Sequence, residues 1–439
     1  MKKRVLLIGY NFSPELTGIG KYSGEMMTWL AKRGYDCTVI TGYPYYPYWK
    51  VQEPYFKNRF WYKTENQDFE SGGHMKVYRC PMYVPAKPSG LKRILLDFSF
   101  MVSAFLILFK LLFVKKYDYV LTVAPSFQFG LLGTLYKKIR KGKLIYHIQD
   151  MQIEAARDLN MINSPKVIDT LFRMENYIFQ KADVVSSISD EMVHRIEKKA
   201  NKPVYLFPNW ADTTKFYPIE DSSELKREFG FDPADKVILY SGAMGEKQGL
   251  EAILYAAKEL QHISQLKFVL CGSGPYKETL QALADKLKIF NIVFLPLQPI
   301  DKFNRFLNIA DLHLIIQKAN ASDLVMPSKL TTILAVGGLA LITSNKESGL
   351  HKMVSKHNLG ILVEAENPVA LYKGILKAIS EDNTHKITNA RLYAEKYLSL
   401  DNVMTSFEEN VFAAEPKVER FVMRDYINVN PVHPVNNFN

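Results

Sequence analysis

The sequence of 439 residues is poor in cysteine, and the cysteines it has do not suggest a metal or disulfide site. Cys37, Cys80 and Cys271 form no pair or cluster with metal-ligand spacing. Because no disulfide framework is expected either, the chain fits a reducing, cytoplasmic compartment.

The signature motifs of several large protein classes are also missing. There is no G-x-S-x-G elbow, no H-E-x-x-H motif and no Walker A loop, which disfavours esterase, zinc-protease and ATP-hydrolase functions. There is also no basic helix, RNP-type aromatic pair or zinc knuckle, so nucleic acid is not an expected partner. The net charge of +11 suggests phosphorylated small molecules or acidic lipid headgroups as partners, although solvated lysine faces would give the same sum.

Long hydrophobic runs are scarce, and the main one covers residues 94–114. This run is long enough to span a bilayer, but Asp97 and Lys110 lie inside it. We predict a helix that covers a sheet with one side and enters a membrane leaflet with the other, which would make the protein peripheral on the inner face of the cytoplasmic membrane. A fully buried core helix and a true transmembrane span are the alternatives. The basic residues that flank the run are Lys92, Arg93, Lys115 and Lys116.

Aromatic residues are concentrated between positions 43 and 62, where three prolines exclude a regular helix or a central strand. Such a loop can form a rim that binds an acceptor sugar, or a belt at a membrane interface. It can equally be a long loop packed on its own side chains. The residues that we single out for acceptor or membrane contact are Tyr45, Tyr46 and Trp49.

What the sequence has in abundance is an alternation of short β-branched runs with helix-period segments, which is typical of parallel α/β units. The alternation runs through residues 1–207 and starts again over 236–398, and the proline-containing stretch 208–235 is interpreted as a hinge. Two doubly wound, Rossmann-like domains place their strand ends, and any ligand, at the central cleft between them. A helix at 399–415 is expected to pack back on the first domain, and 416–439 is interpreted as a poorly ordered tail.

Three turns that join a strand to a helix carry glycine. Glycine lets the backbone approach a ligand closely, and the next helix offers free N–H groups to phosphate. None of these turns has the complete dinucleotide fingerprint, so each alone is a weak signal. A lysine in the second turn would offer a point charge to a diphosphate. The residues concerned are Gly18 and Gly20, then Lys247, then Gly272 and Gly274.

A further helix begins at Pro327-Ser328, and its first-turn N–H groups would face the same cleft. Lys329 lies at the positive end of this helix, which is electrostatically unfavourable unless an anion is bound there. The segment is therefore the best purely physical indication of a phosphate site.

His147 ends a predicted strand within the segment His147-Ile-Gln-Asp150. At a cleft it could hold a sugar hydroxyl or position a reacting group, with Asp150 close enough to orient it. A histidine with a purely structural role is the alternative.

These motifs occur in the order found in a known family. The chain resembles glycosyltransferase family 4, the retaining GT-B enzymes, over nearly its whole length, and within it the WcaI-like colanic-acid and related exopolysaccharide or O-antigen transferases. Each motif alone is modest, but seven in the right order are specific. The segments that carry the resemblance are 10–22, 147–150, 208–212, 240–249, 271–275, 325–329 and 359–363.

The resemblance implies a GT-B fold with the acceptor bound by the N-terminal domain and a nucleotide sugar bound by the C-terminal one. It implies metal-independent transfer with retention of anomeric configuration, and no cofactor beyond the substrate. The implied roles are as follows: Gly18 and Gly20 lie under the donor phosphates or the acceptor, His147 contacts the transferred sugar, Lys247 balances the diphosphate, and the backbone amides of Ser328 and Lys329 bind it.

The sequence departs from the family pattern at two places. Ala243 occupies a position that is commonly arginine, and Leu324 and Thr332 occupy the positions of two glutamates. Asp323, one position away, is a candidate replacement for the first glutamate. These differences leave both UDP- and GDP-sugars open as donors.

The working hypothesis is a transferase that extends a polyprenyl-diphosphate-linked glycan in exopolysaccharide, capsule or O-antigen synthesis. One alternative is a sugar-nucleotide epimerase of the same fold, which would turn over donor without acceptor. Another is a non-catalytic subunit that binds a nucleotide sugar and supports a partner transferase.

Overall fold

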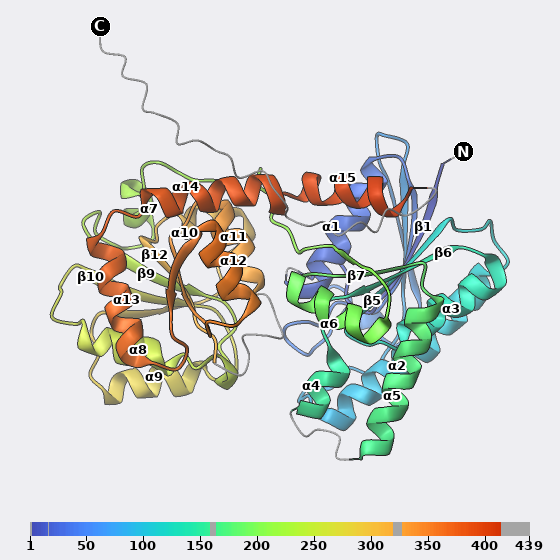
Figure 1. The fold of residues 1–439 in the computed structure, drawn as a ribbon, viewed down its shortest axis with the longest axis horizontal. Helices are drawn as coiled ribbons and strands as arrows, with labels where there is room; N and C mark the ends of the chain where they lie inside the picture. Colours follow the sequence, from blue (N-terminus) through green and yellow to red (C-terminus); the bar gives the residue numbers. More distant parts are fainter. Residues whose placement is uncertain (1, 16, 159–163, 319–326, 414–439) are drawn as a thin grey trace, which may run out of the picture.

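The computed structural model describes residues 2–15, 17–158, 164–318 and 327–413, which form two α/β bodies side by side (Figure 1). Each body is a mostly parallel sheet with helices on both faces, so the predicted doubly wound architecture is confirmed. In each body most of the parallel strands lead through a turn into a helix, as the sequence pattern predicts. The carboxyl ends of these strands therefore lie along one edge of the sheet.

The N-terminal sheet has the strand order β3-β4-β2-β1-β5-β6-β7-β8 among the described residues. All its pairs are parallel except β3 with β4. β3 was not expected from the sequence, because its residues Lys-Thr-Glu-Asn-Gln-Asp are polar and it forms a largely exposed edge. The strands are β1 (Arg4–Ile8), β2 (Asp36–Thr41), β3 (Lys63–Asp68), β4 (His74–Arg79), β5 (Tyr119–Ala124), β6 (Lys143–Ile148), β7 (Val184–Ser187) and β8 (Val204–Leu206).

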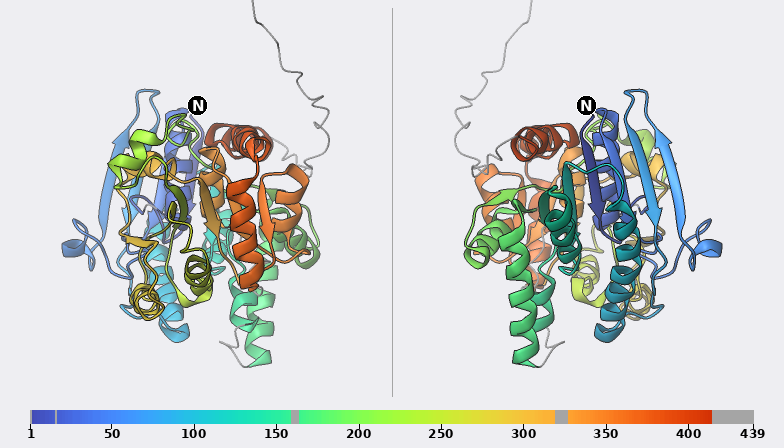
Figure 2. Two further views of the ribbon diagram at one scale, coloured as in Figure 1. Left: turned by 90° about the vertical axis from the view of Figure 1, so that its left-hand side faces the viewer. Right: turned by 90° about the vertical axis from the view of Figure 1, so that its right-hand side faces the viewer.

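Helices α2, α3 and α5 cover one face of this sheet and lie next to one another in the right-hand view of Figure 2. The other face packs against α1 and against α15 (Leu400–Val411), which comes from the far end of the chain. The helices of this body are α1 (Gly18–Lys32), the short 3-10 turn η1 (Phe56–Asn58), α2 (Gly90–Leu111), α3 (Phe129–Arg140), α4 (Gln152–Asp158), α5 (Pro165–Lys181) and α6 (Asp190–Ala200).

The C-terminal sheet is parallel throughout its described pairs, in the order β11-β10-β9-β12-β13-β14. Its strands are β9 (Lys236–Ser241), β10 (Leu266–Cys271), β11 (Ile292–Leu295), β12 (Leu312–Ile315), β13 (Ala340–Thr343) and β14 (Gly360–Val363). The accompanying helices are α7 (Ser223–Glu228), η2 (Glu246–Gln248), α8 (Glu251–Glu259), α9 (Lys277–Lys286), α10 (Ile300–Leu307), α11 (Ser328–Ala335), α12 (Gly349–His357) and α13 (Pro368–Ser380).

The chain crosses between the bodies twice, and the two crossings touch. Ala211 on the outward crossing forms an isolated bridge with Ser399 on the return, and its N–H donates to the carbonyl of Leu398 at 2.8 Å. The return passes from α14 (Thr384–Tyr393) through the π-helical turn η4 (Ala394–Leu398) into α15 (Leu400–Val411), which runs along the top of Figure 1.

The hinge between the bodies is shorter than the predicted segment 208–235. Phe216, Leu225 and Phe231 are buried in the C-terminal core, and α7 lies inside this segment. The sequence did not predict this burial, because the three apolar residues are far apart and lie among prolines and polar residues. Only its first residues therefore cross between the bodies.

Candidate functional site

The turns after β9 and β10 lie backbone against backbone at the carboxyl edge of the C-terminal sheet. A Cβ added to Gly272 would lie 1.9 Å from the carbonyl oxygen of Gly242, and one added to Gly274 would lie 2.1 Å from that of Met244. The Met244 N–H donates to the carbonyl of Ser273 at 2.9 Å. Gly272 and Gly274 thus allow the two turns to meet, and they leave a surface of bare backbone that a ligand can approach.

The N-terminus of α11 reaches this same surface. The Lys329 side chain lies against the turn after β9, because a Cβ on Gly242 would be 3.2 Å from the Lys329 Nζ. That Nζ is 3.7 Å from the centroid of the Tyr240 ring. The structure thus brings together the second glycine turn and the helix start that the sequence had singled out separately.

For the other residues predicted to bind the donor, the structure gives a position in the chain and, for two of them, a degree of exposure. Ser328 is the exposed first residue of α11, and Thr332 lies one turn later, partly exposed. The backbone of Lys247 belongs to η2 in the turn after β9. Asp323 lies outside the described residues.

In the N-terminal body, the loop after β1 is organised by Glu15, a residue that sequence reasoning missed. Its buried carboxylate accepts hydrogen bonds from the backbone N–H groups of Tyr45 and Tyr46, both at 3.0 Å, and from the Asn11 side chain at 2.9 Å. Burial raises the pKa of Glu15 above its usual range despite these donors. The only signal in the sequence was an acid placed just before a glycine-containing helix start.

The two predicted glycines of this loop have different surroundings. Gly18 has φ +62° and begins α1, and its Cβ position would be 3.6 Å from the Tyr46 ring. A Cβ on Gly20 would lie 2.3 Å from the Glu15 carboxylate and 2.6 Å from its Cβ. Gly20 therefore makes room for Glu15, whereas Gly18 supplies a left-handed turn at the helix start.

His147 lies near the end of β6 and is almost fully buried. Its Nδ1 is 3.0 Å from the Ser186 Oγ, which lies directly across from it on β7. The Ser186 hydroxyl is thus a partner of the imidazole that sequence reasoning missed, and the orienting role of Asp150 stays a prediction. Burial lowers the pKa of His147 to about 3, so its imidazole is neutral at physiological pH.

The aromatic segment is only partly a rim. Tyr45, expected at an acceptor surface, is instead buried, with its ring against Tyr10 and Trp49. Tyr46 is exposed beside Gly18, and the guanidinium of Arg93 lies 5.3 Å from the Trp49 ring centroid. The sequence did not predict which of these aromatic rings are buried and which are exposed, because the three prolines interrupt any regular spacing of the residues.

Comparison with known proteins identifies the family. The model of the glycosyl transferase 4-like domain matches residues 17–210, and that of glycosyl transferases group 1 matches residues 221–395. A candidate colanic acid biosynthesis glycosyl transferase of Escherichia coli (strain K12), WcaI, is 37% identical over 93% of this chain and 99% of its own length. The chain belongs to glycosyltransferase family 4. Its resemblance to the WcaI-like branch is thereby confirmed, and the protein is an enzyme that transfers sugars.

Solved structures place this glycosyltransferase in the GT-B fold. Sucrose-phosphate synthase from Thermosynechococcus elongatus superposes with a TM-score of 0.71 at 14% identity, covering 93% of this chain and 98% of the other. Anabaena Alr3699/HepE, solved in complex with UDP and glucose, gives 0.65 at 15% identity over 93% and 99%. WaaG, a glycosyltransferase involved in lipopolysaccharide biosynthesis, gives 0.63 at 14% identity over 92% and 99%.

The two bodies of the glycosyltransferase meet through residues that sequence reasoning did not find. The Thr331 side chain of α11 lies close to the Tyr22 hydroxyl of α1, and burial raises the pKa of Tyr22. A Cβ on Gly349, at the start of α12, would lie 3.1 Å from the Glu191 side chain of α6. The first contact joins α1 to α11, and the second joins α6 to α12.

By length and composition alone, helix α2 is long and apolar enough to cross a membrane. Of its most apolar stretch of 18 residues, 44% is buried. One side packs on the N-terminal core, which includes Phe100, Ala104 and Leu108. The other side exposes a continuous apolar stripe, so the alternative of a fully buried helix is excluded. The exposed large apolar residues of the stripe are Leu91, Ile94, Leu95, Phe98, Val102, Phe105, Leu106 and Phe109, followed by Phe113 and Val114.

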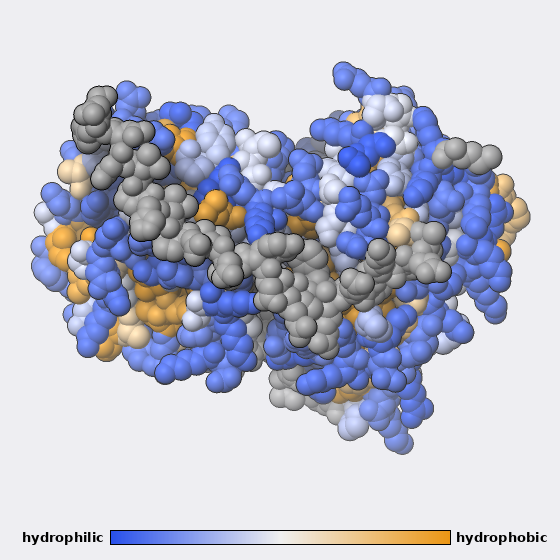
Figure 3. Space-filling model, turned by 45° about the horizontal axis from the view of Figure 1, so that its top comes forward, coloured by the Kyte–Doolittle hydropathy of each residue, from blue (hydrophilic) through white to orange (hydrophobic). Residues whose placement is uncertain are grey.

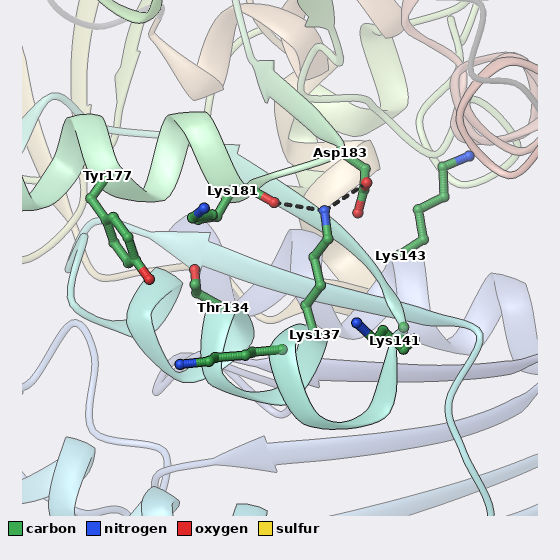
Figure 4. Close-up of a pocket in the computed structure, with 9 residues that line it drawn as sticks. Thr134, Lys137, Lys141, Lys143, Tyr177, Lys181 and Asp183 are labelled. Atoms are coloured by element: carbon green, nitrogen blue, oxygen red, sulfur yellow. Dashed lines mark hydrogen bonds and ion pairs between the residues drawn. The ribbon is translucent and has the colours of Figure 1, made fainter.

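A basic hollow of about 650 Å³ lies away from the cleft, where α3 and α5 end and β6 begins (Figure 4). Lys137 is neutralised there, with its Nζ 2.7 Å from the Asp183 carboxylate and 2.7 Å from the carbonyl of Lys181. Arg140 of α3 donates to the carbonyls of Leu112 and Val114, which ties the hollow to the end of α2. The lining residues are Thr134, Lys137, Lys138, Lys141, Gly142, Lys143, Tyr177, Lys181 and Asp183.

Proposed function

We propose that the enzyme transfers a sugar from a UDP- or GDP-sugar to a glycan linked to a polyprenyl diphosphate at the inner leaflet of the cytoplasmic membrane. The transfer retains the anomeric configuration, needs no metal, and serves exopolysaccharide, capsule or O-antigen synthesis. Family membership supports the transfer itself, and the relative WcaI supports a role in surface polysaccharide synthesis.

The observation that carries the donor half is the meeting of the β9 turn with the α11 N-terminus. The backbone of Gly242 lies beside the Lys329 side chain in the first turn of α11, and the first N–H groups of a helix have no partner within the helix. Such an arrangement suits a diphosphate, because helix N-termini and unobstructed glycine turns both bind anions. Lys247, in the same turn, is proposed to add a cation to the leaving group.

The proposed chemistry depends on stabilising the leaving diphosphate and on positioning, with little need for a protein base. A neutral His147 fits this role, since it can hydrogen-bond a hydroxyl of the transferred sugar without competing for a proton. Its Nδ1 contact with Ser186 fixes the plane of the ring. Retention is proposed from the family, and metal independence from the cationic and backbone groups that meet the diphosphate.

A lipid-linked acceptor fits the surface of the N-terminal body. The apolar stripe of α2 is bordered by exposed cations at both ends, namely Lys92 and Arg93 and then Lys115 and Lys116. The face drawn in Figure 3 is mostly hydrophilic, with apolar side chains in small separate patches. We infer that α2 lies in the headgroup region of an anionic membrane, and that the lysines of the basic hollow extend its cationic border. The exposed Tyr46 is the proposed acceptor contact nearest the cleft.

Thermal-shift measurements with UDP, GDP, ADP and their sugar conjugates test the donor half. A ligand that binds the folded protein raises its apparent melting temperature, by an amount that grows with ligand concentration over Kd. A shift with one nucleotide class supports the proposal and identifies the base, whereas no shift with any of them refutes it. Transfer to a lipid-linked acceptor in the presence of EDTA, followed by NMR of the new anomeric centre, tests metal independence and retention.

A further inference from the structure

The aromatic turn, residues 59–62, leads into β3 and carries three adjacent rings that are exposed to water. Phe60 exposes 69% and Trp61 exposes 74% of its surface, and Tyr62 exposes 44%. A single exposed ring is common on a protein surface, whereas adjacent rings form an apolar patch, and such patches mark sites of interaction. The aromatic turn is therefore a candidate interaction surface.

The aromatic turn is held in place by contacts with the rest of the body. The buried Tyr43 donates its hydroxyl to the carbonyl of Trp61 at 2.7 Å. The guanidinium of Arg59 donates to the carbonyl of Phe56 at 2.7 Å and lies 4.3 Å from the ring centroid of Phe60. The short turn η1, which comes just before it, projects beyond the sheet in both views of Figure 2. The exposure of the rings is thus a feature of an ordered turn.

The aromatic turn lies beside α2 and its exposed stripe. The Tyr62 hydroxyl donates to the carbonyl of Ser103 in α2 at 3.1 Å. One helical turn earlier, the Ser99 hydroxyl accepts a hydrogen bond from the backbone N–H of Tyr83 at 2.9 Å, and the Tyr83 ring is also exposed. Val102, between the two serines that make these contacts, belongs to the exposed stripe. The rings of the turn and the stripe of α2 therefore adjoin each other.

Cations accompany the rings and favour an anionic partner. Lys50 and Lys57 are exposed, and Arg59 is partly exposed. Glu53 is the one carboxylate in the segment 49–62, so the segment carries three cations against one anion. Tryptophan and tyrosine rings next to lysine and arginine are typical of segments that lie at the interface of an anionic membrane.

A membrane accounts for the whole of this surface, whereas a sugar accounts for part of it. Sugars also stack on aromatic rings, but a glycan-binding platform requires neither the cations nor the apolar stripe of α2 next to it. A lipid surface accommodates all three features, because rings and apolar side chains enter the interfacial layer while cations meet the lipid phosphates.

We propose that the aromatic turn is a second membrane anchor, which enters the interfacial layer of the same anionic leaflet as α2. The inference rests on the proposed function, which places α2 in that leaflet. A single amphipathic helix leaves the attached protein free to rock about the helix axis. A second contact to one side of the helix removes this freedom, so the two anchors together set the orientation of the N-terminal body.

This orientation suits a lipid-linked acceptor. Lys63, which follows the aromatic turn, pairs with Arg79 at the end of β4, so the turn lies at the carboxyl edge of the sheet. The loops after β1 and β2, which contain Gly18 and Tyr46, leave the sheet at the same edge. Doubly wound sheets bind their ligands at this edge. Anchoring it to the membrane keeps these loops close to the headgroups, where the diphosphate of the proposed acceptor lies.

The direct test follows the fluorescence of Trp61 in the full chain. Trp29 and Trp210 are buried and Trp49 is partly buried, so Trp61 is the tryptophan that lipid reaches most readily. Vesicles of phosphatidylglycerol and phosphatidylcholine should shift the emission to the blue, and the same vesicles made with brominated lipids should quench it. Trp61→Phe should still bind the vesicles and should lose most of the quenching.

A second test measures partitioning by co-sedimentation with the same vesicles. Phe60→Ser with Trp61→Ser should partition at least ten-fold less than wild type, because two rings no longer enter the lipid. Its melting temperature should hardly change, since both rings are exposed in the folded protein. Phe290→Ser, at a ring of the C-terminal body that is 75% exposed, is the matched control and should behave as wild type.

The outcomes separate the second anchor from the proposed function. If the wild type sediments with the vesicles, but Trp61 is not quenched or the double variant binds equally well, the inference is wrong and the membrane role of α2 stands. If the wild type does not sediment, the membrane part of the proposed function fails as well. A change of emission with soluble dextran and none with vesicles would identify the turn as a sugar-binding platform and would also overturn the inference.

Discussion

The apolar stripe of α2 gives the most quantitative prediction. Phe98, Phe105 and Phe109 expose 59%, 41% and 53% of their surface. A phenylalanine buries about 150–250 Å² when enclosed, so about half of that, roughly 100 Å², remains for each ring to bury in lipid. At about 25 cal/mol per Å², each ring contributes about 2.5 kcal/mol, or about seventy-fold in membrane partitioning, as an upper estimate.

The perturbation is Phe98→Ser with Phe105→Ser, measured by co-sedimentation with vesicles that contain phosphatidylglycerol. The double variant should partition at least a hundred-fold less than wild type, because two such terms multiply when the sites act independently. The melting temperature should hardly change, because both rings point away from the core. The control is Val369→Ser at an exposed position of α13, and equal sedimentation of wild type and the double variant would refute the membrane role of α2.

Three further predictions concern buried groups. Burial raises the pKa of Asp97 from 3.8 to about 6, so the stability that this carboxyl contributes is present below pH 4 and is lost as pH rises to about 6. Asp97→Asn should flatten the fall in stability between pH 4 and pH 7 in urea unfolding, and an unchanged slope would contradict the assignment. Phe407 of α15 is fully buried and stacks on Phe207 at 4.2 Å, so Phe407→Ala should cost about 3–5 kcal/mol. Phe290→Ala, at a residue that is 75% exposed, should cost less than about 0.5 kcal/mol, and equal costs would mean that α15 does not dock as described. Because burial holds the pKa of His147 near 3, the kcat/KM profile should show no ionisation from this residue near pH 6.5. A limb at that pH that disappears in His147→Asn would show that the imidazole titrates during catalysis.

Much of the fold could be predicted because it follows from short-range patterns. Buried parallel strands such as β5 and β9 form continuous apolar runs, and helices alternate with them at the helical period. The half-exposed character of α2 was visible as well, since its charged residues interrupt a long apolar run. The polar edge strand β3 has no such signature, because it pairs with β4 through the backbone and through polar side chains such as Glu65, which forms an ion pair with Arg79.

The candidate site was predicted less completely, because it depends on contacts between segments that are far apart in the sequence. The sequence by itself determined which turns carry glycine, which helices begin beside them, and that a lysine lies at an unfavourable helix end. Only the tertiary structure decided that His147 faces Ser186, that Glu15 folds back onto Tyr45, and that Lys329 rests on the ring of Tyr240. Local patterns depend on the next few residues, whereas these contacts depend on strand register and on the packing of segments from about 30 to about 90 positions apart.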